Sequence, residues 1–475
     1  MRIALIYPNQ VEYSDLVRNF RYVPTYRGKD IVPLGMLYVC GNLSHEVSFL
    51  DASNKNMSND EVERWALERN PDVVGFGGTF CDFPQAREVS ARLRKRGIRT
   101  LYGGPNATVR PEKHIEHFDF LVRGEGETTT QELLDALEAG RSPAGIPGVS
   151  WRDGATPTHN PDRMHHADLD ALAPPARRLI NIADYRRDMR NFDADPGGPT
   201  DVVTASRGCP AACRFCSSKY FWKGSYRTRK PERVIEEIKF MMNTCGTKGI
   251  HFREDNFTIN KKWVFEMCDA LEELRLPWIC QSRVASITDE LVKRMKEAGC
   301  AGISCGFESA NDHTLKYLKK GLRVEDTLET VRVFERYGMK WSGGFMAGVL
   351  NENADDVRNT FAFVRRLTLE NPHARLNACV VRFIGIPVSD TYFEMIREGL
   401  VEYDWQDGEM LIPRTRHLTG SEVEALIDRE YYRLFAGTSR GARRLKYRIL
   451  AALPHRFISG AKTLRRLTKG AVRKK

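Results

Sequence analysis

Residues 201–216 read DVVTASRGCPAACRFC, a stretch that places three cysteines, Cys209, Cys213 and Cys216, within eight residues. The spacing is C-x3-C-x2-C, and the first eight residues of the stretch read as an apolar strand that ends at Gly208. Soft thiolates suit iron–sulfur centres, and three of them this close in sequence can hold one corner of a cluster. The pattern therefore predicts an iron–sulfur cluster with one iron left open for chemistry.

Two other interpretations of the three cysteines stay open. A closed tetrahedral zinc site needs a fourth Cys or His close by, but the next ones downstream are Cys245 and His251. Three free cysteines buried in a loop would need no metal at all. The basic residues Arg207, Arg214 and Lys219 flank the thiols in sequence, and we expect them to lower the pKa values of the thiols.

Residues 201–400 predict six strand–helix units, because short apolar runs alternate with amphipathic segments. After the strand before the cysteines, further strands are expected at residues 249–253, 278–282, 301–307, 340–348 and 376–383. Helices are expected at residues 231–245, 261–274, 288–298, 324–337, 354–368 and 390–399. This alternation is typical of a partial (β/α)6 barrel of the TIM type, with its active site at the carboxyl ends of the strands.

Residues 1–150 show the same alternation and predict an α/β domain with a Rossmann-like parallel sheet. Strands are expected at residues 2–7, 46–51, 72–78, 98–104 and 119–127, and helices at 34–43, 60–69, 84–96 and 128–138. Glycine-bearing turns at residues 75–79, 103–105 and 124–127 fall at strand ends, where open sheets bind ligands. None matches a dinucleotide fingerprint or a Walker A loop. The alternative is that the glycines only make tight turns.

The remaining segments are a connection and a helical end. Residues 151–200 are rich in proline and lack a sustained period, so they read as a linker between the domains. The neighbouring His165 and His166 would point apart on a strand, so we expect no metal there. Residues 401–475 are expected to form a helical C-terminal region, with a helix at 418–437 capped by Thr419 or Ser421.

Charge is concentrated at one end of the 475-residue chain, whose net charge is +11. Residues 440–475 hold 13 Lys and Arg and no acidic residue, so residues 1–439 carry a net charge of −2. Apolar residues recur at helical spacing in this tail, a basic amphipathic pattern typical of contact with a membrane surface. A helix packed on the barrel and a nucleic-acid arm are the alternatives.

Features of export are missing from the sequence, which has no apolar run long enough to span a bilayer. The first residues lack a signal peptide's apolar region and cleavage site. The 11 cysteines are an odd number and do not suggest a disulfide framework. We therefore expect a cytoplasmic protein, with peripheral contact at the inner face of the membrane through the tail.

The cysteine loop resembles the signature of the radical SAM family, including the aromatic Phe215 before the last cysteine. In that family a 4Fe–4S cluster chelates S-adenosylmethionine (SAM) through its open iron, and reductive cleavage gives a 5′-deoxyadenosyl radical. The resemblance implies that the three cysteines are the metal ligands. It also implies SAM contacts at positions that follow in the family's order: Glu254, Asp255, Arg283, Gly306, Glu308 and Ser309.

The first domain resembles the cobalamin-binding domain that precedes many radical SAM domains. The resemblance implies that the corrin lies across the strand carboxyl ends, and that the loop 77–83 faces the lower side of the cobalt. The implied cofactor-binding residues are Pro33, Gly35, Asp51, Gly77, Gly78, Thr79, Phe80, Gly103, Gly104, Pro105, Gly124, Glu125 and Gly126. The Asp-x-His-x-x-Gly motif of other cobalamin domains is missing, because Asp51 is followed by Ala52 and Ser53. The cobalt is therefore expected to have no protein His ligand.

Together these resemblances, which cover about residues 1–400, imply a cobalamin-dependent radical SAM enzyme. They imply methylation of an unactivated carbon of a small-molecule or lipid substrate, through the 5′-deoxyadenosyl radical and methylcobalamin. An electron donor such as flavodoxin or ferredoxin is the expected protein partner.

Several alternatives to methyl transfer remain. The same cofactors serve cyclisation, oxidation or rearrangement, which the sequence does not separate from methylation. An RNA methylthiotransferase would need a second cluster of three cysteines, and the first domain has only Cys40 and Cys81. An iron–sulfur scaffold or sensor is the non-enzymatic alternative.

Overall fold

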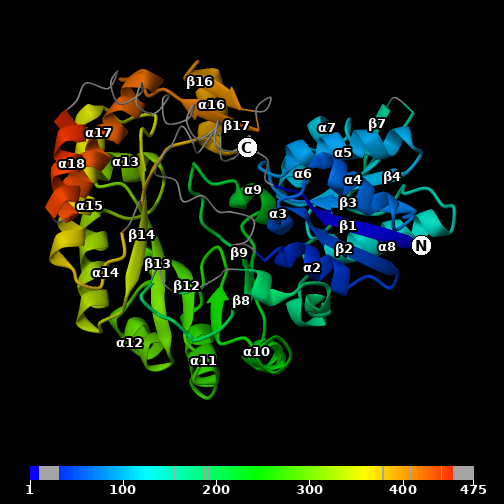
Figure 1. The fold of residues 1–475 in the computed structure, drawn as a ribbon, viewed down its shortest axis with the longest axis horizontal. Coiled ribbons are helices and arrows are strands. Elements are labelled where there is room, and N and C mark those ends of the chain that lie inside the picture. The colour runs from blue at the N-terminus through cyan, green and yellow to red at the C-terminus, as the bar shows by residue number, and fades with distance from the viewer. Residues whose placement is uncertain are drawn as a thin grey trace.

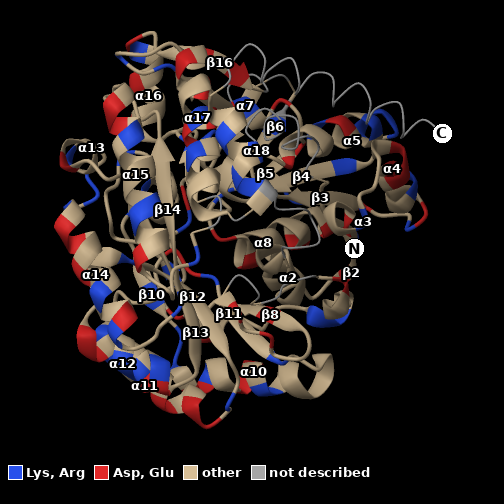
Figure 2. Ribbon diagram, turned by 60° about the vertical axis from the view of Figure 1, so that its left-hand side comes forward, with Lys and Arg blue, Asp and Glu red and all other residues tan. Residues whose placement is uncertain are grey.

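The computed structural model shows two α/β lobes, each built on a parallel sheet (Figure 1). The residues that the structure describes are 1–9, 32–154, 156–185, 189, 192–376, 379–405, 409–439 and 441–452. The first lobe lies around sheet A, and the second around the more strongly curved sheet B (Figure 1). Charged residues lie mainly on outer helices such as α11 (Lys261–Glu272), α12 (Asp289–Glu297) and α14 (Val324–Arg336) (Figure 2).

Sheet A has seven strands in the order β2-β1-β3-β4-β5-β6-β7, and β1 to β5 run parallel. The parallel strands are β1 (Arg2–Tyr7), β2 (Glu46–Asp51), β3 (Val73–Gly77), β4 (Arg99–Gly103) and β5 (Phe120–Val122). Helices α4 (Asn59–Leu67) and α5 (Phe83–Lys95) pack on one face, and α2 (Leu34–Gly41) and α8 (Gly126–Glu138) on the other. The predicted Rossmann-like sheet is confirmed.

Sheet A continues beyond residue 150, into the stretch expected to be a linker. Strands β6 (Val149–Asp153) and β7 (Thr156–His159) add an antiparallel hairpin at the edge next to β5. The last predicted parallel strand is also shorter than expected: β5 ends at Val122, because Gly124 at φ +76° leaves the extended conformation. Three short helices were not predicted, α3 (Ala52–Lys55), α6 (Pro105–Val109) and α7 (Pro111–His114).

Sheet B has six parallel strands in the order β15-β14-β13-β12-β11-β8, which confirms the predicted partial barrel. The strands are β8 (Thr200–Val203), β11 (Gly249–Phe252), β12 (Trp278–Arg283), β13 (Cys300–Glu308), β14 (Trp341–Ala347) and β15 (Val380–Arg382). Besides α11, α12 and α14, the outer helices are α10 (Pro231–Cys245), α13 (Asp312–Tyr317), α15 (Ala354–Glu370) and α16 (Asp390–Arg397). The apolar faces of α10 to α15 and the strand residues that face them form the largest core, whereas α16 packs in a separate cluster.

The strand expected before the cysteines is split in two. Strand β8 ends at Val203, and β9 (Ser206–Gly208) leaves sheet B to pair antiparallel with β10 (Tyr226–Thr228). A Cβ on Gly208 would lie 2.1 Å from the carbonyl oxygen of Ser225, so only glycine fits where β9 approaches the residue before β10. The cysteines and the short helix α9 (Ser218–Trp222) therefore sit in a loop closed at its base by the β9–β10 hairpin.

The amino end of the barrel is filled by the segment that precedes β8. Met189 and Phe192 pack against Ile279 at the start of β12. A Cβ on Gly302 would lie 2.2 Å from the Phe192 ring, so a small residue on β13 makes room for that ring. Described residues of this segment therefore fill space at the amino ends of β12 and β13.

The C-terminal region contains a hairpin as well as helices. Strands β16 (Val401–Trp405) and β17 (Met410–Pro413) pair antiparallel and lie between the two lobes (Figure 1). Helix α17 (Gly420–Thr438) begins with a capping box of Thr419 and Glu422, which confirms Thr419 as the cap, and α18 (Gly441–Ala452) follows. Residues 453–475, most of the predicted basic tail, lie outside the described residues. No described helix has the length and hydrophobicity to cross a bilayer.

Candidate cluster and cofactor site

The three cysteines line one loop at the carboxyl end of β8. Cys209 and Cys213 are buried and Cys216 is half-buried. The Arg283 guanidinium, at the end of β12, donates a hydrogen bond of 3.0 Å to Sγ of Cys213. The amide of Ser218 donates to Sγ of Cys216 at 3.4 Å. These N–H donors face the sulfur atoms, an arrangement that suits thiolate ligands of a cluster.

The expected role of the neighbouring basic residues is wrong. Arg207 pairs with Glu125 and Glu127, Arg214 with Glu394, and Lys219 with Asp390. Each cation is therefore occupied by a carboxylate from another part of the chain. Burial instead raises the pKa values of Cys209 and Cys216. Among the described residues, Arg283 is a cation that donates to a cysteine sulfur, whereas the resemblance implied that it contacts SAM.

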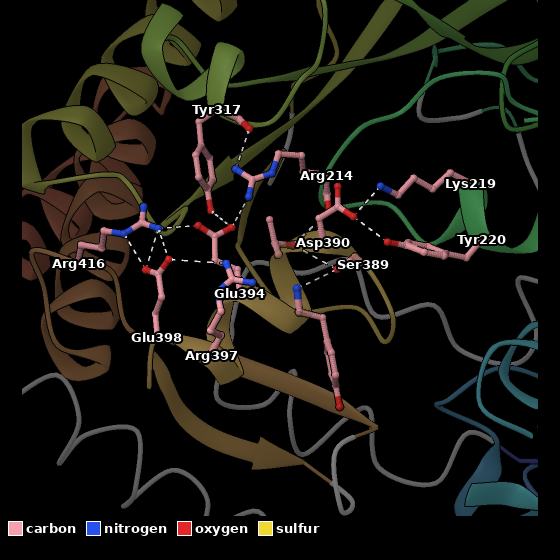
Figure 3. Close-up of polar contacts among 12 residues, drawn as sticks. Arg214, Lys219, Tyr220, Tyr317, Ser389, Asp390, Glu394, Arg397, Glu398 and Arg416 are labelled. Atoms are coloured by element: carbon pink, nitrogen blue, oxygen red, sulfur yellow. Dashed lines mark hydrogen bonds and ion pairs between the residues drawn. The ribbon is translucent and has the colours of Figure 1, made fainter. Parts of the chain in front are cut away.

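The cysteine loop is held against the first turns of α16 (Figure 3). Arg214 donates to Glu394 and lies 4.4 Å over the ring of Tyr317, whose hydroxyl donates to the same carboxylate at 2.8 Å. Its backbone amide donates to the Leu318 carbonyl at 3.0 Å, and its carbonyl accepts from the Thr391 amide at 3.2 Å. Both the side chain and the backbone of Arg214, which lies between Cys213 and Phe215, are thus held by hydrogen bonds.

A second set of hydrogen bonds to the cysteine loop lies one turn earlier on α16. Lys219 Nζ and the Tyr220 hydroxyl both donate to Asp390 Oδ1, at 2.6 and 2.7 Å (Figure 3). Lys219 and Tyr220 belong to α9, which follows the last cysteine. The start of α16 therefore supports both sides of Cys216.

The end of β13 carries an ion pair beside the cysteines. Glu308 adopts a positive φ of +69°, and its Oε1 accepts from Lys320 Nζ at 2.6 Å. A Cβ on Gly306 would lie 2.3 Å from that oxygen, so glycine makes room for the carboxylate. Lys320 also lies 5.9 Å over the Phe215 ring, and its carbonyl accepts from Arg283 at 2.7 Å. The predicted Arg283, Gly306, Glu308 and Phe215 are brought together, joined by Lys320.

One further predicted residue, Ser309, follows the end of β13. Ser309 is buried after β13, and its hydroxyl donates to Glu352 at 3.3 Å. Burial raises the pKa of Glu352 to about 7, although its carboxyl accepts from the amides of Gly348 and Val349. Ser309 is therefore tied to the carboxyl end of β14.

The two acidic residues after β11 differ in exposure, because Glu254 is buried and Asp255 is exposed. Burial raises the pKa of Glu254 to about 8, and its Oε1 accepts from the Ala205 amide at 2.6 Å. Its Oε2 is buried without a hydrogen-bond partner among the described residues. Desolvation by the surrounding protein raises the pKa of Asp255, which accepts from the Ser218 hydroxyl at 3.3 Å. The orphaned oxygen of Glu254 fits an ammonium donor such as the amino group of SAM.

The glycines in the turns of sheet A fall into two groups: at some positions the packing of the chain leaves no room for a Cβ, and at others it leaves room. A Cβ on Gly77 would lie 2.0 Å from Met36 Sδ, and one on Gly78 would lie 2.7 Å from Asp82 Oδ2. Gly104, at φ +107°, would bring a Cβ to 2.7 Å from the Gly78 carbonyl. The chain's own packing requires these glycines. By contrast, Cβ atoms on Gly35 and Gly124 would meet nothing within 4 Å among the described residues, which leave the backbone open there.

The side chains predicted to bind cobalamin make contacts of their own. Asp51 caps α3 through the Asn54 amide and accepts from the Tyr185 hydroxyl at 2.7 Å. Thr79 donates to Asp82 from its amide and its hydroxyl. Phe80 packs against the β16–β17 hairpin. Pro33 precedes α2, Gly103 ends β4, and Pro105 and Gly126 begin α6 and α8.

Glu125 is engaged by the other lobe. Its Oε1 accepts from Arg207 and its Oε2 from Arg227, both at 2.8 Å. Burial opposes its ionisation, but the two guanidiniums hold the pKa of Glu125 at about 2. Since Arg207 and Arg227 belong to the β9–β10 hairpin, the carboxyl ends of the two sheets face each other across this contact.

Contributing residues that were not predicted include Lys320, Glu352, Glu394 and Glu409. Glu409, at the start of β17, is fully buried and accepts from Asn106 and Lys113 of the first lobe, at 2.8 and 2.7 Å. Glu352 was within reach of sequence analysis, because it follows a predicted strand end by a few residues. The others act through partners far away in sequence, which no local pattern shows.

Comparison with known proteins agrees with both halves of this site. Residues 203–364 match the model of the radical SAM superfamily, and residues 23–134 match that of the B12 binding domain. The chain therefore combines a cobalamin-binding domain with a radical SAM domain, and the class of enzyme predicted from the cysteine loop and the first domain is confirmed.

Individual relatives span most of the chain. It is 28% identical over 413 residues to the uncharacterized methyltransferase PH0819 of Pyrococcus horikoshii, covering 84% of this chain and 86% of that protein. It is 27% identical to the anaerobic magnesium-protoporphyrin IX monomethyl ester cyclase of Cereibacter sphaeroides, over 69% of this chain and 55% of the cyclase. The solved structure of the cobalamin-dependent SAM radical enzyme OxsB superposes with a TM-score of 0.69 at 14% identity, over 97% of this chain and 71% of OxsB.

Proposed function

We propose that the protein is a methyltransferase that moves a methyl group from SAM to a carbon of its substrate with the help of cobalamin. The observation that carries the proposal is the apposition of the two sheets, which turns the cysteine loop toward the glycine turns of sheet A. When bound, the cluster supplies the electron that cleaves SAM, and the cobalamin carries the methyl group. The long match to PH0819, described as a methyltransferase, supports the same reaction.

The residues of the chain have separate tasks in this proposal. Cys209, Cys213 and Cys216 hold the cluster, and Arg283 donates a hydrogen bond to Sγ of Cys213. The orphaned oxygen of Glu254 receives the SAM amino group, and Glu308 with Lys320 shapes the floor beside it. The open backbone at Gly35 and Gly124 borders the cobalamin, with Thr79 and Phe80 in the loop below it.

We also propose that the cobalt takes no histidine from this chain. The loop 77–83 contains none. Nearby, His114 is fully buried against the rings of Phe83 and Tyr102, and burial lowers its pKa to about 2. A cobalt without this ligand is more easily reduced to the form that accepts a methyl cation.

Quantifying the products of SAM tests the reaction. The protein is reconstituted anaerobically with iron, sulfide and hydroxocobalamin, then reduced in the presence of SAM. A methyltransferase forms S-adenosylhomocysteine in addition to 5′-deoxyadenosine. A cyclase, which is the second candidate because of the match to the cyclase of C. sphaeroides, forms 5′-deoxyadenosine alone. Iron without bound cobalt would refute both candidates.

The described part of the tail supports contact with an anionic membrane. Tyr447 of α18 packs on Tyr432 and Phe435 of α17. Leu445 and Ile449 point to the opposite side of α18, where they are 61% and 54% exposed. Four cations flank them and are exposed: Arg443, Arg444, Lys446 and Arg448. A helix with one packed face and one apolar, cation-flanked face suits a lipid surface.

Sedimentation with vesicles tests this contact. The full chain should sediment with vesicles that contain phosphatidylserine, whereas the Leu445→Glu, Ile449→Glu double variant and a chain ending at Gly437 should not. Equal sedimentation of all three would remove the argument for a lipid substrate and leave a water-soluble small molecule.

We propose flavodoxin or ferredoxin as the electron donor. Replacing the chemical reductant with each protein in turn tests this proposal.

A further inference from the structure

Two arginines face each other across the hairpin that closes the cysteine loop. Arg207 on β9 and Arg227 on β10 are directly paired in the antiparallel register. Both side chains are mostly buried, at 11% and 12% exposure. Like charges directly opposite each other destabilise a strand pair, and a hairpin of two short strands is marginal even without them. The hairpin therefore needs compensation from elsewhere.

The compensation comes from the first turn of α8 in the other lobe. Glu125 binds one guanidinium with each of its carboxylate oxygens, and Glu127 binds Arg207 at 2.7 Å. Both carboxylates are almost fully buried, with side-chain exposures of 2% and 4%. Two almost fully buried anions thus neutralise two mostly buried cations.

Further contacts fix the orientation of the two arginines. The amide of His166 donates to Oε2 of Glu125 at 2.7 Å, and Arg227 donates to the His166 carbonyl at 2.6 Å. Arg207 also lies 4.9 Å over the ring of Tyr38 from α2. The hairpin is therefore held by three segments of the chain, all of which precede sheet B in sequence.

We propose that Glu125 and Glu127 act as a clamp that keeps strands β9 and β10 paired, so that the cobalamin-binding lobe orders the cysteine loop between them. Glu125 is then a positioning residue for the cluster, in contrast to its predicted role in binding cobalamin. The inference rests on contacts within the protein, and only its consequence for the cofactors depends on the proposed function.

Hydrogen exchange in three variants tests the clamp. We expect Glu125→Gln to speed exchange of the backbone amides in 206–208 and 226–228 by at least about tenfold, which corresponds to about 1.4 kcal/mol. Adding Arg227→Gln to this variant should slow the exchange again, because the hairpin no longer contains two opposed cations. Glu132→Gln is the matched control on α8, since Glu132 pairs with Arg163 away from the hairpin. Its exchange should equal that of the wild type.

Cofactor content separates the clamp from a role in cobalamin binding. After reconstitution, Glu125→Gln should hold less iron than the wild type and the same cobalt. Loss of cobalt with full iron would overturn the proposal, as would unchanged hairpin exchange, or faster exchange in the double variant than in Glu125→Gln alone. If the wild type binds no cobalamin, the proposed function fails, but the exchange measurements still decide the clamp.

Discussion

Replacing Glu394 with glutamine should loosen the cluster loop by about 3 kcal/mol. The carboxylate is almost fully buried on α16 and accepts from Arg214, Arg416 and the Tyr317 hydroxyl. Hydrogen bonds to charged groups contribute about 1.5–3 kcal/mol each, against about 0.5–1.5 for neutral ones. Glutamine keeps the shape and one acceptor oxygen, so each bond weakens rather than disappears.

The magnitude depends mainly on Arg214. The Arg214 side chain is 21% exposed, so the substitution leaves its charge without an anionic partner in a mostly buried position. The Arg416 side chain is 34% exposed and keeps its ion pair with Glu398. Removing one partner of a fully buried pair costs about 3–5 kcal/mol, and the exposure of the arginines places this case at the lower limit. About 3 kcal/mol corresponds to a factor of about 100 in the population of the opened loop.

Iron release to a chelator measures this opening. The reconstituted Glu394→Gln variant should lose iron about 100-fold faster than the wild type, as the open loop exposes the cysteines. Glu398→Gln is the matched control at the C-cap of α16, because Glu398 binds Arg416 but not the cluster loop. Its half-exposed ion pair is worth less than about 1 kcal/mol. Equal release from both variants would refute a loop held by Glu394.

Three other predictions concern single positions. The buried carboxyl of Glu254 has its pKa raised from 4.5 to about 8. It stabilises the fold below pH 4.5, and this contribution is lost as the pH rises through 8. The thermal midpoint of Glu254→Gln should therefore rise relative to that of the wild type as the pH is raised from 5 to 9. Gly104→Ala should cost at least about 2 kcal/mol and lower cobalamin retention, because its Cβ meets a carbonyl oxygen. Gly97→Ala, with a similar φ but open space, should cost only about 1 kcal/mol in a thermal melt. Arg283→Gln should shift the midpoint potential of the cluster to a more negative value in a redox titration followed by EPR, because Cys213 loses its hydrogen bond; an unchanged potential would contradict that contact.

Sequence patterns predicted the elements whose own residues determine them. Helix α10 spans the predicted residues 231–245 because its apolar positions recur at helical spacing and Pro231 begins it. Strands β1 and β2 also have the predicted bounds, since short apolar runs between turns specify buried parallel strands. The order of the units along the chain then fixed both sheets.

Elements that depend on distant partners were missed. The β16–β17 hairpin fell in a region predicted to be helical, because its stability comes from packing against Phe80 and from Glu409 rather than from its own pattern. The split after β8 follows from the pairing of β9 with β10, which the continuous apolar run conceals. Local propensity is a weak guide where tertiary contacts decide the conformation.

The candidate site shows the same division. The cysteines follow directly from their spacing, and Glu254, Arg283 and Glu308 lie near them because strand ends meet at one edge of a parallel sheet. The partners of Arg207, Arg214 and Lys219 were unpredictable, since each carboxylate lies far away in sequence. A cation beside a cysteine in sequence does not reveal which anion it meets in space.

The contact between Asn106 and Glu409 joins residues 303 positions apart, and it has a consequence for biosynthesis. The first lobe leaves the ribosome long before the hairpin that covers Phe80 and neutralises Lys113 has been translated. A nascent chain that stops before residue 400 exposes an unfinished, basic and partly apolar surface, of the kind that recruits chaperones or aggregates. Expression of the isolated first lobe should therefore need a substitute for β16 and β17.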